Sequence, residues 1–108
     1  MDLPRMELRS EFLYRVHIDV EGFYEIGQTF RGHRNIVRVK GGWFEGPKLK
    51  GEVLPGTGDW FLTRPGGVGE GDVRDTYRTY DGHNVYVSYR GIINVDDSTW
   101  ARLRNGED

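Results

Sequence analysis

Turn-forming residues divide this chain at intervals of about eight to twelve residues, a spacing typical of an antiparallel sandwich or barrel. The strongest of these signals are Pro55-Gly56, Pro65-Gly66-Gly67 and Asp81-Gly82. An Asp-Gly pair between two apolar segments favours a tight β-hairpin. We therefore expect an all-β fold, an antiparallel β-barrel of short strands joined by Gly, Pro and Asp turns.

The segments between the turns have the residue pattern of strands. From Phe12 to Val20, apolar residues alternate with polar ones, which is the period of a half-buried strand. A turn is expected at Glu21-Gly22. Further strands are predicted over residues 23–30, 35–44, 48–54, 59–64, 71–80 and 83–93. Residues 96–106 predict one short helix, with Asp97 or Ser98 as its N-cap.

Length and composition restrict the function classes. The 108 residues suit a single domain, residues 1–108, with one modest core. Fifteen basic residues are offset by seventeen acidic ones, so no nucleic-acid-binding footprint is expected. There is no cysteine, which excludes disulfides and a Cys nucleophile. The mean hydropathy of -0.66 and the lack of a long apolar run predict a cytoplasmic protein with no membrane partner.

Three charged residues are candidates for catalysis. Asp59 precedes Trp60, and an apolar neighbour raises the pKa of a carboxyl group toward that of a general acid or base. An Asp after Gly also commonly closes a turn, and this alternative stays open. Asp72 and Arg74 share one face of a strand by parity. Inside a barrel this pair can hold a carboxylate, enolate or phenolate, whereas on a solvated face it is an ordinary ion pair.

Other polar residues indicate ligand binding more than metal chemistry. Tyr86 and Arg90 share a strand face, where they can orient an anionic ligand or simply form cross-strand pairs. The three histidines lie in separate segments without metal-ligand spacing. We therefore expect no metal and no organic cofactor.

The glycine-rich half of the chain resembles a known family. The segment GGWFEGPKLKGEVLPGTGDWFLTRPGG, followed by GDVRDTYRTYDGHNVYVSYRGII, is similar to domain-of-unknown-function family 3237. The resemblance rests on the GG-x-F-x-G turn set, the V-L-P-G turn, the Asp59-Trp60 pair, the D-x-R strand at Asp72 and the Asp81-Gly82 hairpin. It covers nearly the whole chain.

The resemblance implies an antiparallel β-barrel with a central cavity and favours an interior position for Asp72 and Arg74. Asp75 departs from the family pattern, which usually has an aromatic or apolar residue there. Family members also continue past the end of this chain with further strands. We therefore expect either a fragment of a barrel or closure by a partner chain, and so a homo-oligomer.

Three functions fit these residues, and the sequence does not decide whether the protein is an enzyme. The first is a cofactor-independent isomerase, cyclase or lyase acting on a small apolar carbonyl or phenolic metabolite in the barrel cavity. Asp59 or Asp72 would move the proton and Arg74 would stabilise oxyanion charge. Residues expected to shape the cavity or hold the ligand are Phe44, Trp60, Tyr77, Tyr86 and Arg90. The alternatives are a barrel that binds such a ligand without changing it, or a structural assembly protein.

Overall fold

A computed structural model describes residues 2–94 and 96–104. In this part of the chain the elements are β1 (Arg15–Thr29), β2 (Gly32–Glu45), β3 (Lys50–Val53), β4 (Gly58–Thr63), β5 (Gly69–Thr79), β6 (Asn84–Ile93) and α1 (Asp97–Arg104). The strand pairings are antiparallel. The predicted class, an antiparallel β-barrel fold with one short helix near the C-terminus, is confirmed.

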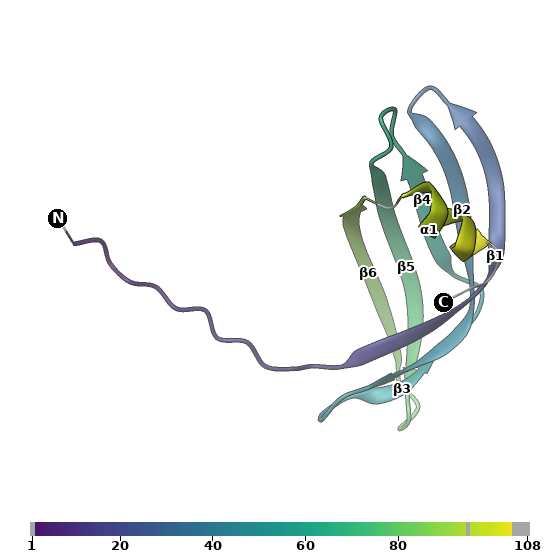
Figure 1. Ribbon diagram of the computed structural model, residues 1–108. Helices are drawn as coiled ribbons and strands as arrows, with labels where there is room; N and C mark the ends of the chain where they lie inside the picture. Colours follow the sequence, from purple (N-terminus) through teal and green to yellow (C-terminus); the bar gives the residue numbers. More distant parts are fainter. Residues whose placement is uncertain (1, 95, 105–108) are drawn as a thin grey trace.

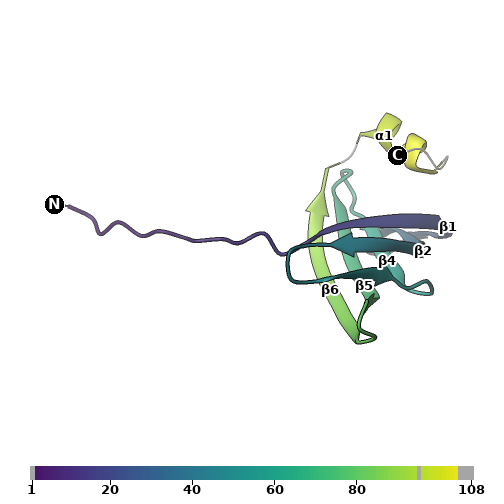
Figure 2. The ribbon, with the colours of Figure 1, turned by 90° about the horizontal axis from the view of Figure 1, so that it is seen from below.

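The strands form one curled sheet in which β3 and β4 both lie between β2 and β5, at different heights along these two strands. β3 pairs with residues 42–45 of β2, and β4 pairs with residues 33–38 of the same strand. Both then pair with β5, which pairs with β6 on its other side. Within the described residues, the edge strands β1 and β6 pair only with β2 and β5. Figures 1 and 2 show the resulting open curl, with β1 and β6 at its two edges.

The strand β1 continues through Glu21-Gly22, where a turn is predicted, so that expectation is wrong. The strand stays paired with β2, and residues without an opposite partner appear as irregularities in the register of the two strands. These lie at Asp19/Val20, Val20/Gly22 and Glu25/Gly27. A bulge absorbs a residue without ending a strand, and it bends the strand more strongly than regular pairing does. The result is a strand longer than the turn spacing predicts.

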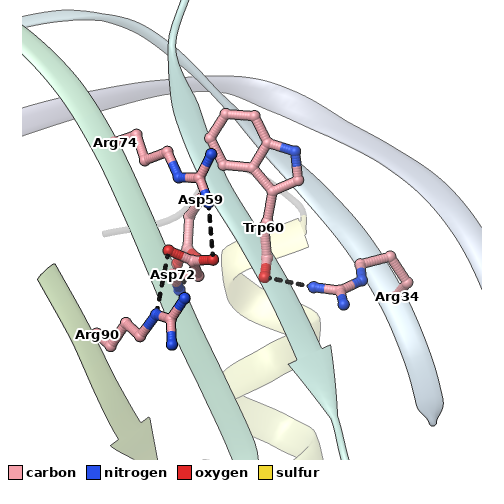
Figure 3. Close-up of polar contacts among 6 residues, drawn as sticks. All are labelled: Arg34, Asp59, Trp60, Asp72, Arg74 and Arg90. Carbon is pink, nitrogen blue, oxygen red and sulfur yellow. Dashed lines mark hydrogen bonds and ion pairs between the residues drawn. The ribbon is translucent and has the colours of Figure 1, made fainter. Parts of the chain in front are cut away.

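The two faces of the sheet differ in character, because side chains alternate along each strand and directly paired residues share a face. The face called the core face here carries the buried hydrophobic cluster of Val39, Phe44, Val53 and Tyr77. The outer face carries the residues in front of the strands in Figure 3, namely Trp60, Asp72, Arg74 and Arg90. In that view α1 lies behind the sheet.

Aromatic rings form the centre of the core. The Phe44 and Tyr77 ring centroids are 5.0 Å apart, and Tyr14 packs edge-on against both. Toward the edge strands the core face is open: Val20 on β1 and Tyr89 on β6 are each about half exposed. The described part of the chain therefore covers the middle of its core face better than the margins.

Glycines inside strands permit close approach of neighbouring backbones, and Gly51 on β3 is an example. A Cβ atom at Gly51 would lie 2.0 Å from the carbonyl oxygen of Arg78 on β5. No side chain fits at that distance. Similar clashes with backbone oxygens would arise at Gly42, Gly46 and Gly58. These glycines let neighbouring backbones lie close together where the sheet bends.

The helix α1 follows β6, and its cap differs from the prediction. Asp96 Oδ1 accepts hydrogen bonds from the backbone N–H of Thr99 (2.7 Å) and from the Ser98 hydroxyl (3.0 Å). The N-cap is therefore Asp96 rather than Asp97 or Ser98. In the described residues, no helix has the length and apolar character needed to cross a membrane.

Candidate functional site

Asp72 and Arg74 lie on the outer face of β5, so their expected interior position is wrong. Asp72 is paired with Arg90 and Arg74 with Ser88 on β6. The strand turns Val73 and Tyr77 toward the core instead, because these side chains remove more apolar surface from water. Arg74 Nη2 lies 3.6 Å from Asp72 Oδ2, in a partly exposed ion pair.

Trp60 and Arg90 join this pair on the outer face (Figure 3). The Arg74 guanidinium carbon lies 5.4 Å from the centroid of the Trp60 ring, in the range of a cation–π contact. Arg90 Nε is 3.8 Å from Asp72 Oδ1. Arg34 Nη1 donates a hydrogen bond to the Trp60 carbonyl oxygen at 2.7 Å. The sequence did not single out Arg34, since it lies two strands away from Asp72.

Asp59 lies on the core face, opposite to its sequence neighbour Trp60. It is paired with Val37 on β2 and Val73 on β5, both core-face positions. Its Oδ1 accepts a hydrogen bond from the backbone N–H of Asp72 at 2.8 Å. Burial raises the pKa of the Asp59 carboxyl, more than the hydrogen bond from Asp72 lowers it. The negative charges of Asp72 and Asp75 raise this pKa further.

Asp75 is a candidate site residue that is not among the predicted site residues. It has no exposed surface, and the Thr57 hydroxyl donates a hydrogen bond to its Oδ1 at 3.0 Å. Its Oδ2 is buried without a hydrogen-bond partner among the described residues. Burial raises the pKa of this carboxyl. The sequence signal that could have found it is parity, since Asp75 lies between Val73 and Tyr77 on the same face of β5.

Two tyrosines lie on the same face as Asp59 and Asp75 and complete a cluster of four titratable side chains. Burial raises the pKa of both Tyr77 and Tyr89, and the Asp75 carboxylate raises them further. Tyr77 is buried, whereas Tyr89, paired with Val73, is half exposed. We call Asp59, Asp75, Tyr77 and Tyr89 the core-face cluster. Shifted pKa values gathered on one apolar face are a common feature of functional sites.

The predicted ligand-binding residues divide between the two faces. Phe44 and Tyr77 belong to the buried core, with 3% and 2% of their surface exposed. Trp60, Tyr86 and Arg90 lie on the outer face, where Tyr86 is largely exposed. The structure therefore does not bring the predicted site together in one cavity. Within residues 2–94 and 96–104, no three His, Asp or Glu side chains gather in a group able to hold a metal ion.

Fold and site together define a small antiparallel β-barrel-like protein, with an acidic and phenolic cluster on its core face and an arginine-rich outer face. The chain belongs to the family described as protein of unknown function (DUF3237), whose model matches residues 8–108.

Curated relatives carry no assigned activity in their names. The chain is 31% identical over 109 residues to a UPF0311 protein of Clostridium acetobutylicum, covering 99% of this chain and 69% of that protein. It is 32% identical over 105 residues to a UPF0311 protein of Rhodopseudomonas palustris, covering 96% of this chain and 67% of the relative.

Solved structures show the same fold. A beta-barrel like protein from Acinetobacter baumannii aligns with a TM-score of 0.69 and 27% identity, over 94% of this chain and 69% of that one. A conserved protein of unknown function from Rhodopseudomonas palustris aligns with a TM-score of 0.76 and 27% identity, over 82% of this chain and 59% of its own. The protein from Clostridium acetobutylicum aligns with a TM-score of 0.74.

Proposed function

We propose that this protein is a cofactor-independent proton-transfer enzyme of the isomerase, cyclase or lyase type. Its substrate would be a small apolar molecule with a carbonyl or phenol group, bound on the core face. The observation that carries the proposal is the partly buried Asp59, whose carboxyl pKa is raised, on the same face as the half-exposed Tyr89.

Each member of the core-face cluster has a role in this proposal. A raised pKa brings the protonation equilibrium of Asp59 closer to neutral pH, where a general acid or base works best. The Tyr89 hydroxyl keeps its proton because its pKa is also raised, so it can donate a hydrogen bond to a substrate oxygen. Arg74, which we expected to stabilise oxyanion charge, lies on the other face. Tyr89 takes over that role.

The buried Asp75 acts as a positioning group rather than by contact with substrate. Protonation of its Oδ2, which has no hydrogen-bond partner among the described residues, avoids an isolated negative charge in the core. Its charge state also sets the electrostatic environment of Asp59 and the tyrosines. The apolar side chains of Val85 and Ile93, paired with Tyr77 and Gly69, supply a surface for the body of the substrate.

Binding without turnover is the second candidate. It is favoured by the complete burial of Asp75, which leaves Asp59 as the carboxyl of the core-face cluster with surface that a ligand can touch. An enzyme that needs a separate acid and base would have to take the second group from Tyr89. A binding protein needs no second group.

The test follows exchange of the α-protons of 2-tetralone, a small apolar ketone, into deuterated water by nuclear magnetic resonance. We expect the wild-type protein to accelerate exchange, Asp59→Asn to abolish the acceleration and Tyr89→Phe to reduce it. Asp72→Asn is the matched control, because it removes a carboxylate from the outer face of the same sheet. Equal acceleration by wild type and Asp59→Asn would overturn the proposal. Binding of 2-tetralone without exchange would establish the second candidate.

We also propose that the protein is a cytoplasmic homo-oligomer. The support is the edge of the sheet: within the described residues β1 and β6 each have one unpaired side, and Val20 and Tyr89 expose apolar surface on the core face beside them. Light scattering that shows only monomers at all concentrations would contradict this.

A further inference from the structure

We propose that a groove on the outer face is a second binding site, specific for a small molecule with an apolar, planar body and one carboxylate. The groove encloses about 380 Å³, which lies in the range of small-molecule sites. It lies across the start of β2 and across β4, β5 and β6, on the opposite side of the sheet from the core-face cluster. It therefore goes beyond the proton-transfer site.

The walls of the groove carry an excess of positive charge. Four arginines and two carboxylates line it: Arg31, Arg34, Arg64, Arg90, Glu70 and Asp72. Arg64 is neutralised, because its Nε and Nη2 donate to Glu70 Oε1 at 3.0 and 2.6 Å. Asp72 is shared between Arg90 and the neighbouring Arg74 at 3.8 and 3.6 Å, both longer than hydrogen bonds.

Two arginines remain for a ligand. In the described part of the chain, no carboxylate forms an ion pair with Arg31 or Arg34. Arg34 is held in place by the hydrogen bond from its Nη1 to the Trp60 carbonyl oxygen. A guanidinium fixed in this way still presents other N–H groups, and its planar fork matches a carboxylate with two parallel hydrogen bonds.

The remainder of the lining is apolar. Trp60, Leu62 and Ile92 lie among the arginines. The Arg74 guanidinium carbon lies 5.4 Å from the Trp60 ring centroid, so the indole also has a cationic neighbour outside the groove. The Arg31 guanidinium lies over the Phe30 ring, with its carbon 5.6 Å from the ring centroid, and in the described residues neither Arg31 nor Arg34 has a carboxylate partner. An apolar floor beside these two guanidinium groups fits a flat hydrocarbon body with a carboxylate at one end.

The experiment uses 2-naphthoate as the probe and 2-naphthamide as its uncharged counterpart, titrated into the full chain by calorimetry. We expect 2-naphthoate to bind at least about tenfold more tightly than 2-naphthamide, because hydrogen bonds to a charged group are the stronger ones. Arg34→Gln and Arg31→Gln should each reduce the affinity for 2-naphthoate several-fold and leave that for 2-naphthamide unchanged.

Arg78→Gln is the matched control, since it removes one arginine from the outer face at a position outside the groove. Arg34 also donates a hydrogen bond to the Trp60 carbonyl oxygen, so Arg34→Gln removes that contact together with the charge. Arg31→Gln removes a charge and leaves this hydrogen bond intact. Equal binding of the two probes, no binding of 2-naphthoate, or an equal loss in Arg78→Gln would overturn the proposal. So would loss of 2-naphthoate binding in Asp59→Asn with full binding in Arg34→Gln, which would place the ligand on the core face. Failure of 2-tetralone exchange leaves these outcomes unaffected, because the two sites lie on opposite faces.

Discussion

The backbone N–H of Asp72 donates a hydrogen bond to Asp59 Oδ1 across 2.8 Å, although the two side chains lie on opposite faces of the sheet. Asp59 thus takes a backbone donor of the neighbouring strand as its partner, while the Asp72 side chain interacts with arginines on the outer face. This contact physically joins the core-face cluster to the arginine groove. It also makes Asp59 both a structural acceptor and the candidate proton carrier.

The two functions of Asp59 can be separated by substitution. Asp59→Ala should lower the free energy of unfolding by about 1–3 kcal/mol, because the N–H of Asp72 loses its acceptor. Asp59→Asn keeps an oxygen in the same place and should remain close to wild type. Urea denaturation of both variants measures the difference. A loss of stability in Asp59→Asn as large as in Asp59→Ala would show that the charge, not the acceptor, matters.

Stability should fall as the pH rises above the ordinary aspartate pKa of 3.8. Burial raises the folded-state pKa of Asp75 and Asp59, so between the unfolded and folded pKa values the folded chain holds more protons than the unfolded chain. Their contribution to stability is therefore complete below 3.8 and is lost as the pH passes the folded values.

Asp75→Asn should remove much of this slope, since an amide does not titrate. Thermal unfolding at a series of pH values tests it: the variant should gain stability over wild type at pH 8 and not at pH 3.5. The pKa values of Asp81 and Asp96 are lowered instead, which confines their opposite effect to pH values below about 4. An unchanged slope in Asp75→Asn would contradict the assignment.

Gly51→Ala should destabilise the protein by about 1–3 kcal/mol or more, because its Cβ would meet the Arg78 carbonyl oxygen and push β3 away from β5. Gly91→Ala is the matched control on β6, where an added Cβ meets no atom within 4 Å. Chemical denaturation of the two variants should show a large loss in the first and little change in the second. Similar losses in both would mean that close backbone approach is not the cause.

Phe44→Ala should lower the free energy of unfolding by about 3–5 kcal/mol, since it removes a ring that is 3% exposed and packs on Tyr14 and Tyr77. Phe12→Ala removes the same ring from a position that is 62% exposed and should change stability little. Thermal unfolding followed by circular dichroism compares them. A small effect of Phe44→Ala would contradict the assignment of this cluster as the core.

The sequence by itself determined the strands after Gly32, the Asp81-Gly82 hairpin and the barrel class, because these depend on local alternation and turn chemistry. It also determined by parity that Asp72 and Arg74 oppose Val73, Asp75 and Tyr77. It did not determine which of the two faces turns inward. That depends on the summed burial of paired strands, and it was misjudged for Asp72 and Arg74.

The tertiary structure alone decided three further features. Pairing with β2 keeps β1 extended through Gly22, where local residues predict a turn, because cross-strand pairing outweighs a single turn signal. Burial in the core raised the pKa of Asp75. Curling of the sheet gathered Arg31, Arg34 and Arg90 into one groove from strands and a turn far apart in sequence. Local patterns carry no information on such neighbours, because they depend on the long-range register and curvature of the whole sheet.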